Sequence, residues 1–221
     1  MPRFLKIFVH SKEADVASKA ECAYKQQLEY CKKAWHSHSY GLERLVRLFL
    51  CSAQFAFPLL LVRDLFGRKG ATSRKLAVEA YNVAKFIFPL AVLATGLYRR
   101  PAVTGIIIYL LSETVLHILS LIFLEDIHGA LPSYRRSILL LFLHYLEVVF
   151  DFAVIYITFG LVSEALTPVS AVYFSLVANT TVGFGDIHAQ GSAGQAAVIA
   201  QLIVGVLFII LFINHFSERE K

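Results

Sequence analysis

Long apolar stretches separated by short polar ones occupy most of this chain. The stretches lie at about residues 46–66, 76–98, 102–125, 137–162 and 196–216. Most are close to the roughly 20 residues that an α-helix needs to cross a hydrocarbon core of about 30 Å. The pattern predicts an all-α helical membrane protein. It also predicts a polar, partly amphipathic N-terminal segment at 1–45, followed by membrane helices through residue 134.

The first apolar stretch, 46–66, is ambiguous. Its continuous apolar part is short, it contains Pro58, and Arg47 and Arg63 bracket it. Stretches of this length are often interfacial or re-entrant, although flanking arginines can extend to the membrane surface and let a short helix cross. Both arrangements stay open, and we favour the interfacial or re-entrant one.

Composition narrows the class of protein. The chain is 57% hydrophobic and has a mean hydropathy of +0.62, which is too apolar for a soluble domain of 221 residues. Its net charge of +5 matches Lys and Arg flanking membrane helices, and no pattern indicates nucleic acid as a partner. The three cysteines, Cys22, Cys31 and Cys51, lack metal-ligand spacing, so we expect free thiols.

A short helix is predicted between the last two apolar stretches. Thr167 is a favourable N-cap and Pro168 suits the first helical position. The segment from Val169 to Asn179 is then about three turns long, which is half a membrane thickness. The negative end of its dipole would favour a cation beyond its C-terminus.

The sequence Thr180-Thr181-Val182-Gly183-Phe184-Gly185-Asp186 follows this short helix. An ion that sheds water in a narrow pore needs carbonyl oxygens in its place. Aiming successive carbonyls along one axis requires a backbone of alternating hand, which Gly183 and Gly185 adopt at low cost. Thr181 adds a hydroxyl oxygen at the inner end, and Asp186 would attract cations at the outer mouth.

This segment resembles the selectivity filter of the tetrameric potassium channel pore-domain family. The resemblance implies an outer helix, pore helix, filter and inner helix at 135–216, followed by a short cytoplasmic tail at 217–221. It also implies a filter made of Thr181, Val182, Gly183, Phe184, Gly185 and Asp186. Potassium ions would bind at Thr181, Val182, Gly183 and Phe184, with no organic cofactor. Phe184 departs from the tyrosine of many relatives and lacks a hydroxyl that can brace the filter.

A single filter cannot surround an ion, so the expected assembly is a homotetramer in a lipid bilayer. We expect passive, selective potassium conduction by a multi-pass protein of the plasma membrane, and no enzyme activity. Two alternatives stay open: a weakly selective cation channel, and a non-conducting membrane scaffold or sensor with a channel-like pore domain.

The filter mouth faces outward in this family, which fixes the expected topology. Arg135 and Arg136 are then inside, Arg99 and Arg100 outside, and the basic linker at 63–75 inside. The linker agrees with the positive-inside rule, whereas Arg99 and Arg100 do not. The N-terminus is inside if 46–66 does not cross, and outside if it does.

The inner helix contains a candidate hinge. Gly205 lies where many relatives carry a gating glycine, but a lone glycine in a membrane helix also serves as a packing notch. Both roles stay open. On the adjoining helical face we expect the cavity lining: Val206, Ile209, Ile210 and Ile213.

Acidic side chains and histidines also occur within the predicted spans. Glu113 and His117 are spaced i, i+4 on one span, and His144, Glu147 and Asp151 share one face of the outer helix. We expect them to form a polar network within the membrane, either as static packing or as a switch that biases the pore through protonation. We expect no Lys or Arg at matching depth.

Overall fold

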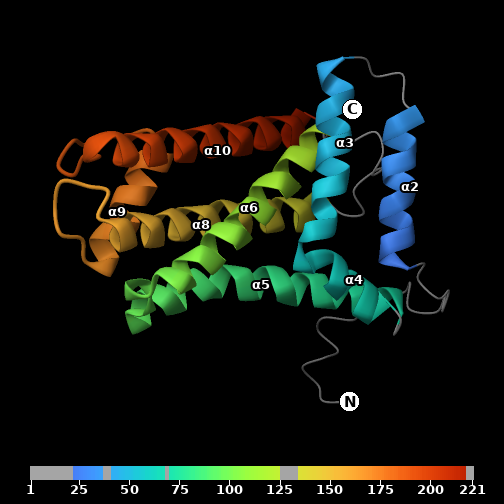
Figure 1. Cartoon of the computed structure of the whole chain (residues 1–221), viewed down its shortest axis with the longest axis horizontal. Helices are drawn as coiled ribbons and strands as arrows, with labels where there is room; N and C mark the ends of the chain where they lie inside the picture. The colour runs from blue at the N-terminus through green and yellow to red at the C-terminus, as the bar shows by residue number, and fades with distance from the viewer. Residues whose placement is uncertain (1–21, 37–40, 68–69, 125–133, 218–221) are drawn as a thin grey trace. The chain divides into compact units, whose positions relative to one another are not determined.

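The structure is a computed structural model that describes residues 22–36, 41–67, 70–124 and 134–217. Their regular elements are helical: α2 Ala23–His36, α3 Leu42–Ala53, η1 Gln54–Ala56, α4 Pro58–Gly67, α5 Ala71–Thr95, η2 Leu97–Arg99, α6 Pro101–Phe123, α8 Tyr134–Phe159, α9 Pro168–Asn179 and α10 Gly191–Ser217 (Figure 1). The all-α membrane fold expected from the hydrophobic pattern is confirmed. The expected tail at 217–221 lies almost wholly outside the described residues.

Four of these helices are long and apolar enough to cross a membrane: Ser73–Thr95, Pro101–Phe123, Arg136–Phe159 and Gly191–Asn214. A fifth crossing would need α3, η1 and α4 to act as one span, although they are bent by 67°. The bend lies at Phe57 and Pro58, where Phe57 leaves the helical region with φ −111° and ψ 150°. This backbone is the one that a following proline favours.

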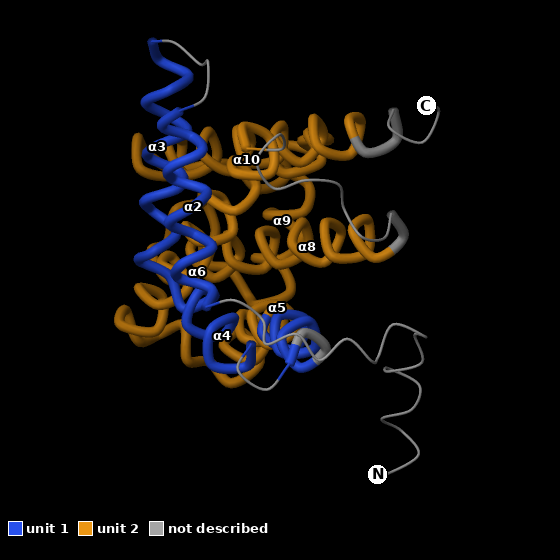
Figure 2. Tube along the Cα trace, turned by 90° about the vertical axis from the view of Figure 1, so that its right-hand side faces the viewer, with its two compact units in different colours: residues 1–81 blue, residues 82–221 orange. Residues whose placement is uncertain are grey.

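The chain divides into two compact units, residues 1–81 and 82–221 (Figure 2), and each is described by itself. In the first unit, α2 packs against α3 and α4. The Asp64 Oδ1 atom of α4 accepts hydrogen bonds from the Ala23 backbone N–H at 3.2 Å and from Cys22 Sγ at 3.0 Å. Buried Gln27 donates to the Cys51 carbonyl at 3.0 Å. Side-chain contacts therefore join the polar helix α2 to both arms of the bent pair.

In the second unit, the short helix α9 packs against both α8 and α10, and it lies between these two long helices in Figure 1. One apolar core joins the three, with Val148, Tyr156, Phe174 and Phe208 among its buried members. Phe208 is fully buried and its ring meets that of Tyr145 edge to face, with centroids 5.6 Å apart. This packing fixes where α9 ends, and the filter sequence begins at that end.

Candidate selectivity filter and its supports

Helix α9, the candidate pore helix, begins where the sequence predicts. Thr167 caps α9: its hydroxyl accepts from the Ser170 N–H, the Ser170 hydroxyl accepts from the Thr167 N–H, and Pro168 follows. The helix is 12 residues long and ends at Asn179. The next backbone N–H groups bond back to its last carbonyls, Thr181 to Ala178 at 3.0 Å and Val182 to Val177 at 3.2 Å. The start of the filter sequence is thereby tied to the end of the pore helix.

The filter backbone alternates in hand. Thr181, Gly183 and Gly185 have φ values of 60°, 57° and 81°, whereas Val182 and Phe184 between them are not in this region. The positive φ expected at the two glycines is confirmed. Thr181 is the one non-glycine residue with a positive φ in the described part of the chain. A β-branched residue is strained in this conformation, and such strain persists where surrounding structure enforces it and is typical of functional sites.

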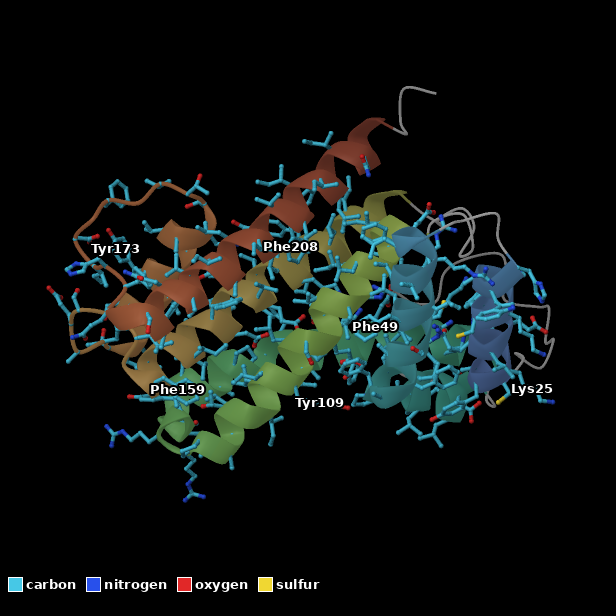
Figure 3. The ribbon with its side chains drawn as sticks, turned by 45° about the horizontal axis from the view of Figure 1, so that its top comes forward. Lys25, Phe49, Tyr109, Phe159, Tyr173 and Phe208 are labelled. Atoms are coloured by element: carbon cyan, nitrogen blue, oxygen red, sulfur yellow. The ribbon has the colours of Figure 1, made fainter. Side chains whose placement is uncertain are left out.

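Tyr173 braces the outer end of the filter. Its hydroxyl donates to Asp186 Oδ2 at 2.8 Å, and its ring stacks on Phe184 with centroids 6.4 Å apart and planes 3° from parallel. Phe184, which lacks a hydroxyl, therefore lies beside a hydroxyl that α9 provides, and Figure 3 labels Tyr173. The hydrogen bond from Tyr173 lowers the pKa of Asp186, which keeps the carboxylate ionised to lower pH.

Residues 188–190, which follow the filter sequence, are hydrogen-bonded to residues 161–163, which follow α8. Ser163 N–H donates to the His188 carbonyl at 2.9 Å, and Gln190 N–H donates to the Leu161 carbonyl at 2.8 Å. A Cβ atom at Gly194, in the first turn of α10, would collide with the Leu161 carbonyl oxygen. This close approach requires glycine, and it holds the C-terminal end of the 180–190 loop against the segment that follows α8.

A buried hydrogen-bond chain joins the three helices beneath the filter. Tyr156 of α8 donates to Gln201 of α10 at 2.7 Å, and the Gln201 amide donates at 2.8 Å to both the carbonyl and the hydroxyl of Ser175 on α9. The Ser175 hydroxyl continues to the Val149 carbonyl at 2.6 Å. The sequence analysis did not predict this series of hydrogen bonds. The signal was a glutamine within a span, where polar side chains are costly unless partnered.

Gly205, the candidate hinge, lies within an unbroken α10 and against the C-terminus of the pore helix. A Cβ atom at Gly205 would lie 2.8 Å from Asn179 Oδ1 and 3.4 Å from the Asn179 carbonyl oxygen. Asn179 is buried, and within the part of the chain that the structure describes neither polar atom of its amide has a hydrogen-bond partner. The contact gives the packing-notch alternative a specific partner, while the hinge role stays a prediction.

The expected cavity-lining residues form an exposed face within one subunit. Their exposed fractions are 52% for Val206, 52% for Ile209, 39% for Ile210 and 62% for Ile213. Phe208, on another face of α10, is fully buried against α8. The exposed face therefore needs other protein, lipid or a water-filled cavity beside it.

The expected intramembrane network is present in part, and it contains a residue that the sequence reasoning missed. Lys85 of α5 pairs with Glu113 of α6 at 3.3 Å and with Glu147 of α8 at 3.2 Å. Its ammonium group also donates to the Thr114 hydroxyl at 2.6 Å and to the Leu110 carbonyl at 3.2 Å. The expectation that no Lys or Arg lies at the depth of these acids is therefore wrong. We call Lys85, Glu113, Thr114, His144 and Glu147 the charge cluster.

The remaining members of the expected network lie around Glu147. This residue accepts from Thr114 at 2.9 Å and lies 2.8 Å from His144 Nδ1, and the His144 ring meets that of His117 with centroids 5.9 Å apart. Asp151 is buried, but its Oδ2 atom has no hydrogen-bond partner among the described residues. Within the described residues, no group of three or more His, Cys, Asp or Glu side chains could hold a metal ion.

Comparison with known proteins identifies the region that holds the filter sequence. A family model described as "Ion channel" matches residues 144–220, which include most of α8, all of α9 and α10, and the loop between them. No curated protein and no solved structure matches the chain. Residues 144–220 are therefore similar to an ion channel domain, and the four long apolar helices support a multi-pass integral membrane protein.

Proposed function

We propose that four copies of this chain form a potassium-selective channel, with one copy of residues 181–186 from each subunit lining a central pore. The observation that carries the proposal is the alternating backbone at Thr181, Gly183 and Gly185. A backbone that alternates in hand turns successive carbonyls toward one side, which is the arrangement that replaces the hydration shell of an ion. The strain at Thr181 supports the same role, because strained backbone of this kind clusters at functional sites.

Exposure supports assembly around the filter. Val182 and Phe184 are 56% and 69% exposed within one subunit, although both are large and apolar. Exposed apolar groups of this size next to a pore helix need a covering surface. Neighbouring subunits would cover them and complete a ring of carbonyls that one chain cannot form.

The proposed potassium ions would be held by backbone carbonyls of Thr181, Val182, Gly183 and Phe184, and by the Thr181 hydroxyl. Asp186 would give the outer mouth its negative charge, and the hydrogen bond from Tyr173 favours that ionised form. The plasma membrane is the proposed location.

Flux measurements on purified protein in liposomes test the proposal. We expect a potassium gradient to drive flux and an equal sodium gradient to drive little, with external barium blocking the potassium flux because barium is close to potassium in size and binds the same carbonyl cage tightly. Equal potassium and sodium flux would favour the weakly selective channel. The absence of either flux from a verified tetramer would favour the scaffold or sensor.

A further inference from the structure

The first unit contains a helix that cannot follow its neighbours into a membrane. α2 lies antiparallel to α3: Gln27, near the start of α2, bonds to Cys51, near the end of α3. At the opposite end, Arg44 of α3 donates to the Trp35 carbonyl at 3.0 Å and lies over the Trp35 ring, 4.5 Å from its centroid. The two helices are thus paired along the whole length of α3, and Figure 1 shows them side by side.

α2 also contacts the second arm of the bent pair. Asp64 of α4 accepts from the Ala23 N–H, and Arg63 lies 3.5 Å from Gln26 Oε1. Any path of α3 and α4 across a hydrocarbon core would therefore draw α2 in with them. A helix of 14 residues is about 21 Å long, so most of α2 would leave water.

The charged side chains of α2 exclude that arrangement. Lys25, Glu29, Lys32 and Lys33 are all exposed, and none of the ion pairs found among the described residues joins them. Placing a lysine at the centre of a bilayer costs about 2.5–3.5 kcal/mol on insertion scales, and α2 has three. The 67° bend between α3 and α4 is a second reason that they do not form one straight span.

An apolar face nevertheless points outward from α3. Leu42, Leu45 and Phe49 are 77%, 66% and 61% exposed and follow i, i+3, i+7 on one face, and Figure 3 labels Phe49 on α3. In α4, Leu61 and Leu65 are exposed at i, i+4. A helix pair with one polar partner and one exposed apolar face has the composition of an interfacial membrane helix.

The charge of this region and its connection to α5 indicate that lipid contacts the exposed apolar face of α3. From residue 23 to residue 75, ten Lys and Arg accompany three Asp and Glu, which favours anionic lipid headgroups. The membrane-spanning part of α5 begins at Ser73, shortly after α4 ends at Gly67. The bilayer that α5 enters is therefore within reach of α4.

We propose that α2, α3 and α4 form an interfacial platform on the cytoplasmic leaflet. In this platform Leu42, Leu45 and Phe49 enter the headgroup region and the basic residues bind anionic phospholipid. The 46–66 segment then does not cross, and residue 23 lies on the side where α5 begins. Assigning that side to the cytoplasm rests on the proposed channel function, whereas the absence of a crossing does not.

Labelling from one side of the membrane tests the topology. In a cysteine-free background, Lys33→Cys probes the platform and Arg99→Cys probes the turn between α5 and α6; both positions are exposed. We expect an impermeant maleimide to label Arg99→Cys in intact cells and Lys33→Cys only in inverted vesicles. Labelling of both from the same side would overturn the proposal. The result does not depend on potassium flux, so a failed flux assay leaves this test intact.

Fluorescence quenching tests the lipid contact, since the chain has one tryptophan. With Trp35→Phe and Phe49→Trp combined, lipids brominated near the headgroup should quench more than lipids brominated near the chain end, and more strongly in anionic than in neutral bilayers. Strongest quenching from the bilayer centre would indicate a span. No quenching by either lipid would mean that protein, such as a second copy of the chain, covers this face; both results overturn the proposal.

Discussion

The filter sequence and the charge cluster both place polar groups in the apolar unit 82–221, and they do so in opposite ways. At the filter, the polar groups are backbone carbonyls, and their segment is exposed within one subunit and strained at Thr181. In the charge cluster, the polar groups are side chains from three helices, and Lys85 and Glu147 are almost fully buried. The proposed filter would therefore need partners outside its own chain, whereas the charge cluster finds its partners within it.

This difference separates two kinds of role. The backbone of residues 181–186 is strained at Thr181 and exposed within its own chain. Such a segment suits a site that binds an ion or contacts another subunit. A buried cluster with short contacts on every side suits a joint that holds α5 and α6 to the outer helix α8. Changes at the filter should therefore alter conduction with little effect on the fold, and changes in the cluster should alter the fold first.

The largest effect is expected at the filter. Gly183→Ala should abolish potassium flux in liposomes while the tetramer still forms, because a Cβ atom disfavours the φ of 57° that aims the carbonyls. No atom of the described residues of the same chain lies within 4 Å of the added Cβ, so the effect expected within one chain is one of backbone conformation. Gly160→Ala is a matched control, since Gly160 has φ 58° and equally open surroundings outside the filter. Full flux in Gly183→Ala would remove the basis for the filter.

The second effect tests whether the cluster is structural. Lys85→Met leaves two buried carboxylates without their cation and should lower the free energy of unfolding by about 4 kcal/mol, the order found for breaking buried ion pairs. Thermal unfolding of the purified protein in detergent measures it. Lys75→Met, at an exposed position of the same helix, should change stability little. Combining Lys85→Met with Glu113→Gln and Glu147→Gln should recover part of the loss. Equal stability of Lys85→Met and Lys75→Met would contradict the structural role.

The helix start and the glycine backbone of the filter region could be predicted from the sequence, whereas the side-chain contacts between helices could not. The reason is physical. Thr167 and Pro168 define a helix start through local chemistry, and the two glycines define a left-handed backbone through sterics, so both could be predicted without tertiary contacts. Lys85 is a single cation in an apolar helix, and its partners Glu113 and Glu147 come from two other helices. Nothing local in the sequence indicates that these three meet.

The same limit applies to residues beneath the filter. Gln201 lies in a long apolar stretch whose pattern predicts only a membrane span, yet its amide joins α8, α9 and α10. Asn179 lies at the end of the pore helix, and only the packing of α10 against α9 reveals that it meets Gly205. Side-chain partners across helices require the three-dimensional arrangement, which periodicity alone does not determine.

A smaller effect separates the two roles considered for Gly205. Gly205→Ala places a Cβ atom 2.8 Å from Asn179 Oδ1, and overpacking of this kind costs about 1–3 kcal/mol. If the glycine is a notch, adding Asn179→Ala should restore both stability and potassium flux, because it removes the atom that clashes. If the glycine is a hinge, the double variant should keep the conduction defect of Gly205→Ala. Stability and flux measured on all three variants distinguish the two roles.

The smallest effect is expected at the outer mouth, where the filter does have a side-chain partner in its own subunit. Tyr173→Phe keeps the ring on Phe184 and removes only the hydroxyl that donates to Asp186. The pKa of Asp186, lowered by that bond, should rise toward its ordinary value. On acidification, the variant should therefore lose the negative charge of its mouth, and part of its potassium flux, at a higher pH than the unmodified protein. At neutral pH the Asp186 carboxylate is ionised in both proteins, so their fluxes should agree. Flux measured from pH 7 down to pH 3 gives the comparison, with Asp186→Asn as the control that has no carboxylate to titrate. Superimposable curves for Tyr173→Phe and the unmodified protein would mean that the hydroxyl does not tune Asp186.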